Sequence, residues 1–159
     1  MYSRLLVPLD GSATSRLALA HAQTLARLSG ARVTLLHVID ELRHSNGFER
    51  PQVYIDEVRP RFLQAGQALL DEARQEMEKA GVATDTLLLE SEGRRASELI
   101  VQQAAEIGAD VIVLGTHGRR GMHRWMLGSD AEQVARTAPV PVMLVRPSTA
   151  DVPEGAVSA

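Results

Sequence analysis

The feature that most constrains the fold is a regular alternation of short apolar segments with longer amphipathic ones. The short segments are rich in Val, Leu and Ile and have the composition of buried strands; they cover residues 4–9, 32–39, 82–90, 110–114 and 140–145. The longer segments between them have helical spacing. Because a strand, a helix and a further strand form a βαβ unit with parallel strands, the pattern predicts an α/β fold with one open parallel sheet and helices on both faces.

Local signals set the expected helix ends. Ser12 is a typical N-cap for the first helix, and Gly30 is suited to end it. The spacing predicts an apolar face for this helix at Leu17, Ala20, Thr24 and Leu28. The other helices are expected at 57–80, with Pro60 in the first turn, at 96–107 and at 129–138.

Composition excludes several classes of protein. The 159 residues contain 45% apolar but only 3% aromatic residues, so the core must consist of aliphatic side chains. Cysteine is absent, which excludes disulfides and thiolate metal sites. The net charge of -3 gives no general attraction to nucleic acids or acidic membranes. With no signal peptide or membrane-spanning run, we expect a cytoplasmic protein with one domain at 1–147 and a disordered tail at 148–159.

Residues 115–129 have the composition of an anion-binding loop. The sequence places Gly115, Gly118 and Gly128 between the apolar segment 110–114 and a helix that Ser129 would open. Glycine permits sharp turns and close approach of the backbone to a ligand, and a helix N-terminus favours negative charge. The loop also carries arginines, namely Arg119, Arg120 and Arg124, and no acid up to Gly128. A plain glycine-rich turn with solvated arginines is the alternative. The Gly-Lys-Ser/Thr of a P-loop is missing.

Two distant segments are expected to meet at this loop. The first strand leaves through Pro8, Leu9 and Asp10, and the fourth leaves at Gly115. Ligands of open parallel sheets bind beyond the carboxyl ends of the strands, where the strand order reverses. If these two strands are neighbours, both exits face one crevice. Asp10 would then contact the ligand or a nucleotide-bound Mg²⁺, or act only as a turn residue.

Four segments together resemble the universal stress protein family, and in particular its ATP-binding branch. They are Leu6-Val7-Pro8-Leu9-Asp10-Gly11-Ser12, His37-Val38-Ile39-Asp40, Gly108-Ala109-Asp110, and the spacing Gly115-x2-Gly118-x9-Gly128-Ser129. The resemblance spans residues 2–147. It implies an adenine nucleotide alpha hydrolase-like sheet in the order 3-2-1-4-5 and a homodimer. It also implies that ATP, ADP or AMP binds in the crevice, with or without Mg²⁺.

The resemblance also implies which residues bind the nucleotide. Pro8, Leu9 and Asp10 would line the nucleoside, and Val38 would touch adenine. Ribose and phosphates would be held by Gly115, Thr116, His117, Gly118, Arg119, Gly128, Ser129 and the amide of Asp130. Asp130 is a departure, because the family commonly has a small apolar residue there. Its charge would oppose the outer phosphates of ATP more than the phosphate of AMP.

Several interpretations remain open at this stage. A dimeric nucleotide-dependent sensor or regulator of a stress response, with a protein partner unknown, is the first. A slow ATPase or phosphoryl-transfer enzyme is the second, although no catalytic group is clearly placed. A nucleotide-free interaction module is the third. The long loop 40–56 is either a lid or simple loop variation. The apolar edge strand 140–145 would pair with a second copy or be covered by the tail.

Overall fold

The protein is an open, five-stranded parallel sheet with helices on both faces. The computed structural model describes residues 1–41, 51–117 and 127–148. The strands are β1 (Arg4–Pro8), β2 (Arg32–Ile39), β3 (Thr84–Glu90), β4 (Val111–Gly115) and β5 (Val142–Val145). They lie in the order β3-β2-β1-β4-β5, and every neighbouring pair is parallel. The predicted fold class and strand order are therefore confirmed.

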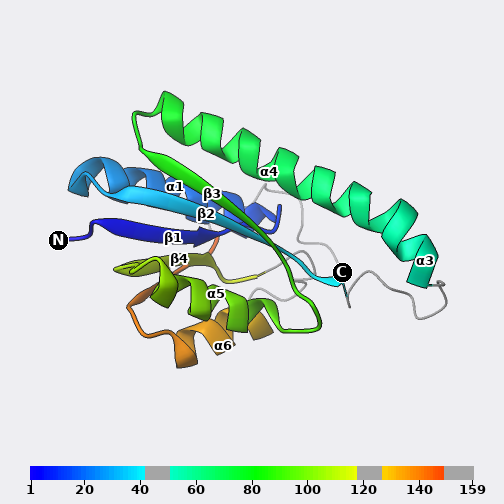
Figure 1. Ribbon diagram of the computed structural model, residues 1–159. Coiled ribbons are helices and arrows are strands. Elements are labelled where there is room, and N and C mark those ends of the chain that lie inside the picture. The colour runs from blue at the N-terminus through cyan, green and yellow to red at the C-terminus, as the bar shows by residue number, and fades with distance from the viewer. Residues whose placement is uncertain (42–50, 118–126, 149–159) are drawn as a thin grey trace, which may run out of the picture.

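The helices form two layers (Figure 1). One face of the sheet carries α1 (Ala13–Ser29) and α4 (Arg59–Lys79), and the other carries α5 (Ala96–Glu106) and α6 (Ser129–Thr137). Each face has its own aliphatic core, because successive strand residues point to opposite sides. Thus Leu5 and Val7 of β1 pack with α1 and α4, whereas Leu6 packs with α5 and α6.

The ends of α1 agree with the prediction, but its buried face does not. Ser12 is the N-cap and its side chain accepts a hydrogen bond from the backbone of Ser15; Gly30 ends the helix with φ 71°. The buried face is instead formed by small residues, including Ala18, Ala22 and Ala26, while Leu28 is 82% exposed. Both stripes have helical spacing. The alanine stripe faces the sheet, where small side chains allow a helix to approach closely.

The predicted loop at 40–56 is wrong for its second half. The chain is already helical at Pro51, with α3 (Pro51–Val53) and a π-helical turn, η1 (Tyr54–Val58), leading directly into α4. Residues 42–50, where a lid was considered, lie outside the described residues. The π turn ends two residues before Pro60, and the N–H of Arg59 bonds to the carbonyl of Tyr54. A proline ring clashes with the carbonyl four residues back, so a wider turn accommodates it.

Hydrogen bonds at the start of the sheet fix β1 against β4. The carboxylate of Asp110 accepts bonds from the backbone N–H groups of Ser3 at 2.6 Å and Arg4 at 2.8 Å. These bonds to the charged form lower the pKa of Asp110 below its usual value. The guanidinium of Arg4 also donates to the carbonyl of Ile107 at the end of α5. The opposite, carboxyl ends of β1 and β4 are thereby held side by side.

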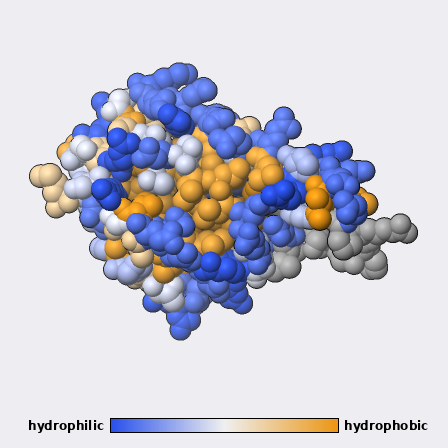
Figure 2. All heavy atoms as spheres, in the orientation of Figure 1, coloured by the Kyte–Doolittle hydropathy of each residue, from blue (hydrophilic) through white to orange (hydrophobic). Residues whose placement is uncertain are grey.

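The described residues leave part of one face of the sheet uncovered. Figure 2 shows apolar side chains at the surface between α4 and α5, over β2 and β3. Half-buried residues on this side include Val38, Leu87, Leu89 and Val101. Within the described ranges, no helix is long and apolar enough to cross a membrane.

Gly66 offers a test of the packing between α4 and the sheet. A Cβ at this position would lie 2.8 Å from Cδ2 of His37 and 2.9 Å from Leu88. We expect Gly66→Val to lower the free energy of unfolding by about 2 kcal/mol through overpacking. Urea unfolding followed by circular dichroism measures this. The control Gln64→Val, on the exposed side of α4, should cost only about 0.5 kcal/mol. Equal losses in the two variants would contradict the close packing.

Candidate functional site

The exits of β1 and β4 open into one pocket, as the strand order requires. Leu5 and Leu6 of β1 pair with Val111 and Ile112 of β4, so the two strands end next to each other. The pocket between their exits has a volume of about 430 Å³. This size suits a small organic ligand, since such sites typically measure about 300–1,000 Å³.

The structure brings most of the predicted site residues together around this pocket. It is lined by Pro8, Leu9, Asp10, Val38, Gly115, Thr116, His117, Gly128, Ser129 and Asp130. Gly118 and Arg119, with Arg120 and Arg124, lie outside the described residues. Lining residues that the sequence analysis did not place there are Ser12, Ser15, Leu36, Asp40, Ala96, Ile100, Leu114 and Ala131. The α5 residues among them could not be foreseen, because the loop pattern does not show where α5 begins relative to the crevice.

The first wall of the pocket is the turn between β1 and α1. Asp10 lines the pocket, and its carboxylate accepts a bond from the N–H of Ser12 at 2.9 Å. Gly11 adopts φ 79°, a left-handed conformation that favours glycine. The carboxylate of Asp10 therefore acts as a turn residue and also faces the crevice.

The same turn forms hydrogen bonds with the beginning of the glycine loop. The hydroxyls of Ser12 and Thr14 both donate to the carbonyl of His117, the Ser12 bond measuring 3.3 Å. A Cβ on Gly115 would lie 2.7 Å from the carbonyl carbon of Thr14 and 2.8 Å from its oxygen. Gly115 was expected to let the backbone approach a ligand. The structure gives a different reason for glycine there, namely the contact between the end of β4 and the start of α1.

Both ends of the glycine loop are fixed by backbone hydrogen bonds. Thr116 donates its N–H to Val145 at 2.9 Å, and Gly128 donates to Thr116 at 2.8 Å. The side chains of Thr116 and His117 are bonded at 2.9 Å through Oγ1 and Nδ1. Nε2 of His117 is buried and makes no hydrogen bond within the part of the chain that the structure describes. These bonds connect the residues that line the pocket at the end of β4 to β5 and to the start of α6.

The N-terminus of α6 forms the second wall. Its N-cap is Gly128, with φ −60° and ψ 148°, and no side chain caps the helix. Ser129 was expected to serve as the cap; it is instead the first helical residue, because Gly128 already has the extended conformation of an N-cap. Asp130 and Glu132 lie in the first turn, where acids stabilise a helix. The N-cap residue itself has no side chain to bond with the first turn of α6.

The opposite end of the pocket is apolar and ends at β2. Its walls include Leu36, Val38 and Ile100. The N–H of Leu9 bonds to the carbonyl of Leu36, and β1 itself stops at Pro8. In a parallel strand, alternate residues direct their backbone groups to the same side. The N–H and C=O of Val38 therefore point past the end of β1 toward the crevice, as one donor beside one acceptor.

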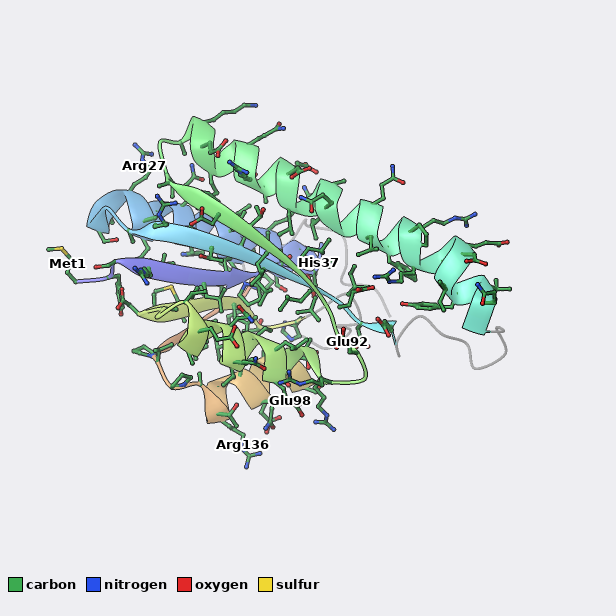
Figure 3. The ribbon with its side chains drawn as sticks, viewed as in Figure 1. Met1, Arg27, His37, Glu92, Glu98 and Arg136 are labelled. Atoms are coloured by element: carbon green, nitrogen blue, oxygen red, sulfur yellow. The ribbon has the colours of Figure 1, made fainter. Side chains whose placement is uncertain are left out.

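The remaining candidate residues have structural roles or lie outside the site. His37 was interpreted as structural, and its Nδ1 lies 2.6 Å from the carbonyl of Leu9, in hydrogen-bond contact. Figure 3 places His37 on β2 in the middle of the molecule, whereas Glu98 and Arg136 project from the outer sides of α5 and α6. His44 and His123 are outside the described residues. Among the residues that are described, no group of three His, Asp or Glu side chains could hold a metal ion.

A partly exposed ion pair lies at the end of β3. Arg59 of α4 binds the carboxylate of Glu90 through two hydrogen bonds, of 2.5 and 2.9 Å. This hydrogen bonding lowers the pKa of Glu90 below its usual value. The pair links the beginning of α4 to the carboxyl end of β3.

Comparison with known proteins agrees with this architecture. The Universal stress protein family matches residues 1–146. The chain belongs to the universal stress protein family. Universal stress protein YxiE of Bacillus subtilis is 32% identical over 151 residues, which cover 92% of this chain and 100% of YxiE.

Solved structures of the family have the same fold. The structure of MJ0577, a universal stress protein of Methanocaldococcus jannaschii, superposes with a TM-score of 0.82 at 28% identity and covers 94% of this chain and 99% of that one. The universal stress protein of Archaeoglobus fulgidus, solved in complex with dAMP, gives a TM-score of 0.62 at 26% identity, with 91% and 98% of the two chains covered.

Gly115 provides a test of the contact between β4 and α1. We expect Gly115→Ala to lower the free energy of unfolding by about 2 kcal/mol, because two of the three nearest atoms belong to the Thr14 backbone and cannot rotate away. Chemical denaturation measures this value. Adding Thr14→Ala should not restore stability, since that substitution removes only the side chain. Full recovery in the double variant would show that the clash is not with the backbone.

Proposed function

We propose that this protein binds an adenine nucleotide in the pocket between β1, β4 and the N-terminus of α6. The observation that carries the proposal is the convergence of the predicted site residues on one pocket of about 430 Å³. The N-terminus of α6, which lines the pocket, suits a phosphate group. The Val38 backbone offers a donor and an acceptor, which match N1 and the exocyclic amine of adenine. The dAMP complex of the Archaeoglobus fulgidus relative supports the same ligand class.

The charge of the pocket favours a nucleotide with few phosphates. Asp130 lines the pocket from the first turn of α6, near the expected phosphate position. Its carboxylate would oppose a triphosphate more strongly than a monophosphate. Mg²⁺ shared between a carboxylate, such as Asp10 or Asp130, and the phosphates would relieve this repulsion. AMP and ADP are therefore the expected ligands without metal, and ATP with Mg²⁺.

We further propose that the protein acts in the cytoplasm as a nucleotide-dependent sensor or regulator. In this role, nucleotide-bound and free forms present different surfaces to a partner, and the ligand shifts the balance between them. Slow ATP hydrolysis remains the competing activity. Time-resolved ADP release with Mg²⁺ distinguishes the sensor from the enzyme. Enzymes typically turn over at about 1–10³ s⁻¹, so a far lower rate supports the sensor.

The direct experiment is mass spectrometry of small molecules released from the purified protein on denaturation. Recovery of an adenine nucleotide supports the proposal. Titration with AMP, ADP and ATP should also raise the melting temperature, because a ligand that binds only the folded state stabilises it. If no nucleotide co-purifies and none raises the melting temperature at millimolar concentration, the protein is a nucleotide-free interaction module.

Gly128→Val tests the position of the phosphate. The backbone angles of Gly128 are accessible to valine, so the fold should persist, with a loss of about 1 kcal/mol from the poorer N-cap. The new side chain would block the approach of a phosphate to α6. We expect AMP binding, measured by calorimetry, to weaken at least about tenfold. Gly128→Ser, with a smaller side chain, should lose less. Unchanged affinity in both variants would place the phosphate elsewhere.

We also propose that the protein forms a homodimer through the Val140–Val145 segment. β5 is an edge strand of the sheet, and Met143 on it is 37% exposed. Antiparallel pairing of two copies about a two-fold axis would give the unpaired backbone groups of both edge strands hydrogen-bond partners.

Met143→Lys tests this interface. A charge on the exposed part of β5 should shift the protein from dimer to monomer in sedimentation equilibrium. Leu28→Lys, on an exposed leucine of α1, is the matched control and should leave the mass unchanged. A monomeric wild type, or a dimer that tolerates both substitutions, would contradict the proposal.

A further inference from the structure

Asp40 occupies a position in the pocket that the phosphate chemistry does not explain. It lies directly after the end of β2 and lines the pocket together with Val38 and Ala96. Asp10 follows β1, and Asp130 belongs to α6 at the phosphate end. Asp40 therefore places an acidic residue beside Val38 at the β2 end of the pocket, where the base of the proposed nucleotide would lie. This inference rests on the proposed nucleotide binding.

The backbone on both sides of Asp40 is held by one buried residue. The N–H of Ser91 donates to the carbonyl of Ile39 at 2.9 Å, and Oγ of Ser91 accepts from the N–H of Glu41 at 3.3 Å. Ser91 itself is only 1% exposed. The residue after β3 thus fixes the residues before and after Asp40. A group fixed in this way is preorganised for recognition.

The order of polar groups along β2 matches one edge of adenine. The strand presents the N–H of Val38, then the C=O of Val38, and then the carboxylate of Asp40. Adenine presents N1, an acceptor, followed by an exocyclic amine with two hydrogens. If N1 and the first amine hydrogen bond to Val38, the second hydrogen points onward along the strand toward Asp40.

We propose that Asp40 determines base specificity by accepting a hydrogen bond from the exocyclic amine of adenine. A carboxylate only accepts hydrogen bonds, and it has roughly four acceptor positions, so it can bind a ligand amine together with another partner. A base with an oxygen in place of the amine would set that oxygen against the carboxylate. Ser91 is a positioning residue in this arrangement, because it acts only through the backbone that carries Asp40.

The test compares AMP with IMP, in which an oxygen replaces the amine and N1 carries a hydrogen. The mismatch at Val38 is common to the wild type and to Asp40→Asn, so a difference between their affinity ratios reports on Asp40. The wild-type protein should bind AMP at least about tenfold more tightly than IMP in calorimetry, because buried polar groups left without partners penalise the wrong ligand. In Asp40→Asn the amide can donate to this oxygen, and the ratio of the two affinities should fall by at least about tenfold. Ser91→Ala should reduce the ratio to a smaller extent, and Ser91→Thr should restore it.

Asp130→Asn is the matched control, since it removes the same charge from the other end of the pocket. It should change the affinities for AMP and IMP by the same factor and leave their ratio unchanged. AMP binding with a ratio that Asp40→Asn leaves intact would overturn the assignment of Asp40 while preserving the nucleotide site. Preference of the wild type for GMP over AMP would also overturn it. Failure of the wild type to bind any of these nucleotides would overturn the proposed function itself.

Discussion

The parallel pairing of β1 with β4 is the constraint on which the site depends. Strands β2 and β3 follow on one side of β1, and β4 and β5 lie on the other. Chain connections therefore leave the two central strands in opposite directions, and a crevice remains between their carboxyl ends. The bonds from Ser3 and Arg4 to Asp110 secure this pairing at the far end of the strands. Contacts at the amino ends of these strands thus help to hold a site at their carboxyl ends.

The N-terminus of α1 converts this crevice into a defined pocket. Ser12 caps α1 and contacts the carbonyl of His117, to which Thr14 also donates. The absence of a side chain on Gly115 lets the end of β4 come into contact with Thr14. These hydroxyls and this glycine therefore join the start of α1 to the end of β4 and to His117. A ligand then finds the base of its site already formed, which lowers the entropy cost of binding.

Features set by local chemistry could be predicted from the sequence. Ser12 and Gly30 mark the ends of α1 because capping and left-handed backbone have strong residue preferences. The strand order and the convergence of Pro8 to Asp10 with Gly115 followed from the family resemblance and from the rule for parallel sheets. The pocket residues that could be predicted lie at the ends of β1 and β4, on β2 and at the start of α6.

Features set by tertiary packing could not be predicted in this way. The buried face of α1 was misassigned, since Leu28 and Ala26 both fit a helical stripe and only the distance to the sheet distinguishes them. The π turn before Pro60 arises because the helix begins earlier than the proline signal suggests. The contact of Gly115 with Thr14 and the contacts of Ser91 on both sides of Asp40 could not be predicted, because in each case the partners lie fifty or more residues apart in the chain.

The three carboxylates of the pocket differ in how much charge they present to an anion. Asp10 accepts a bond from Ser12 within its own turn, so part of its charge is compensated where the β1 exit meets the crevice. Asp40 stands beside the apolar walls, at a distance from α6 set by the width of β1 and β4 between them. Asp130 alone shares the first turn of α6 with the proposed phosphate position, where the helix N-terminus stabilises both it and a phosphate. Asp130 and a bound phosphate would compete for the same helix end. Each added phosphate would therefore contribute less binding free energy than the one before it. Under the proposed function, Asp130, the position that departs from the family pattern, is therefore the carboxylate expected to limit the number of phosphates most directly.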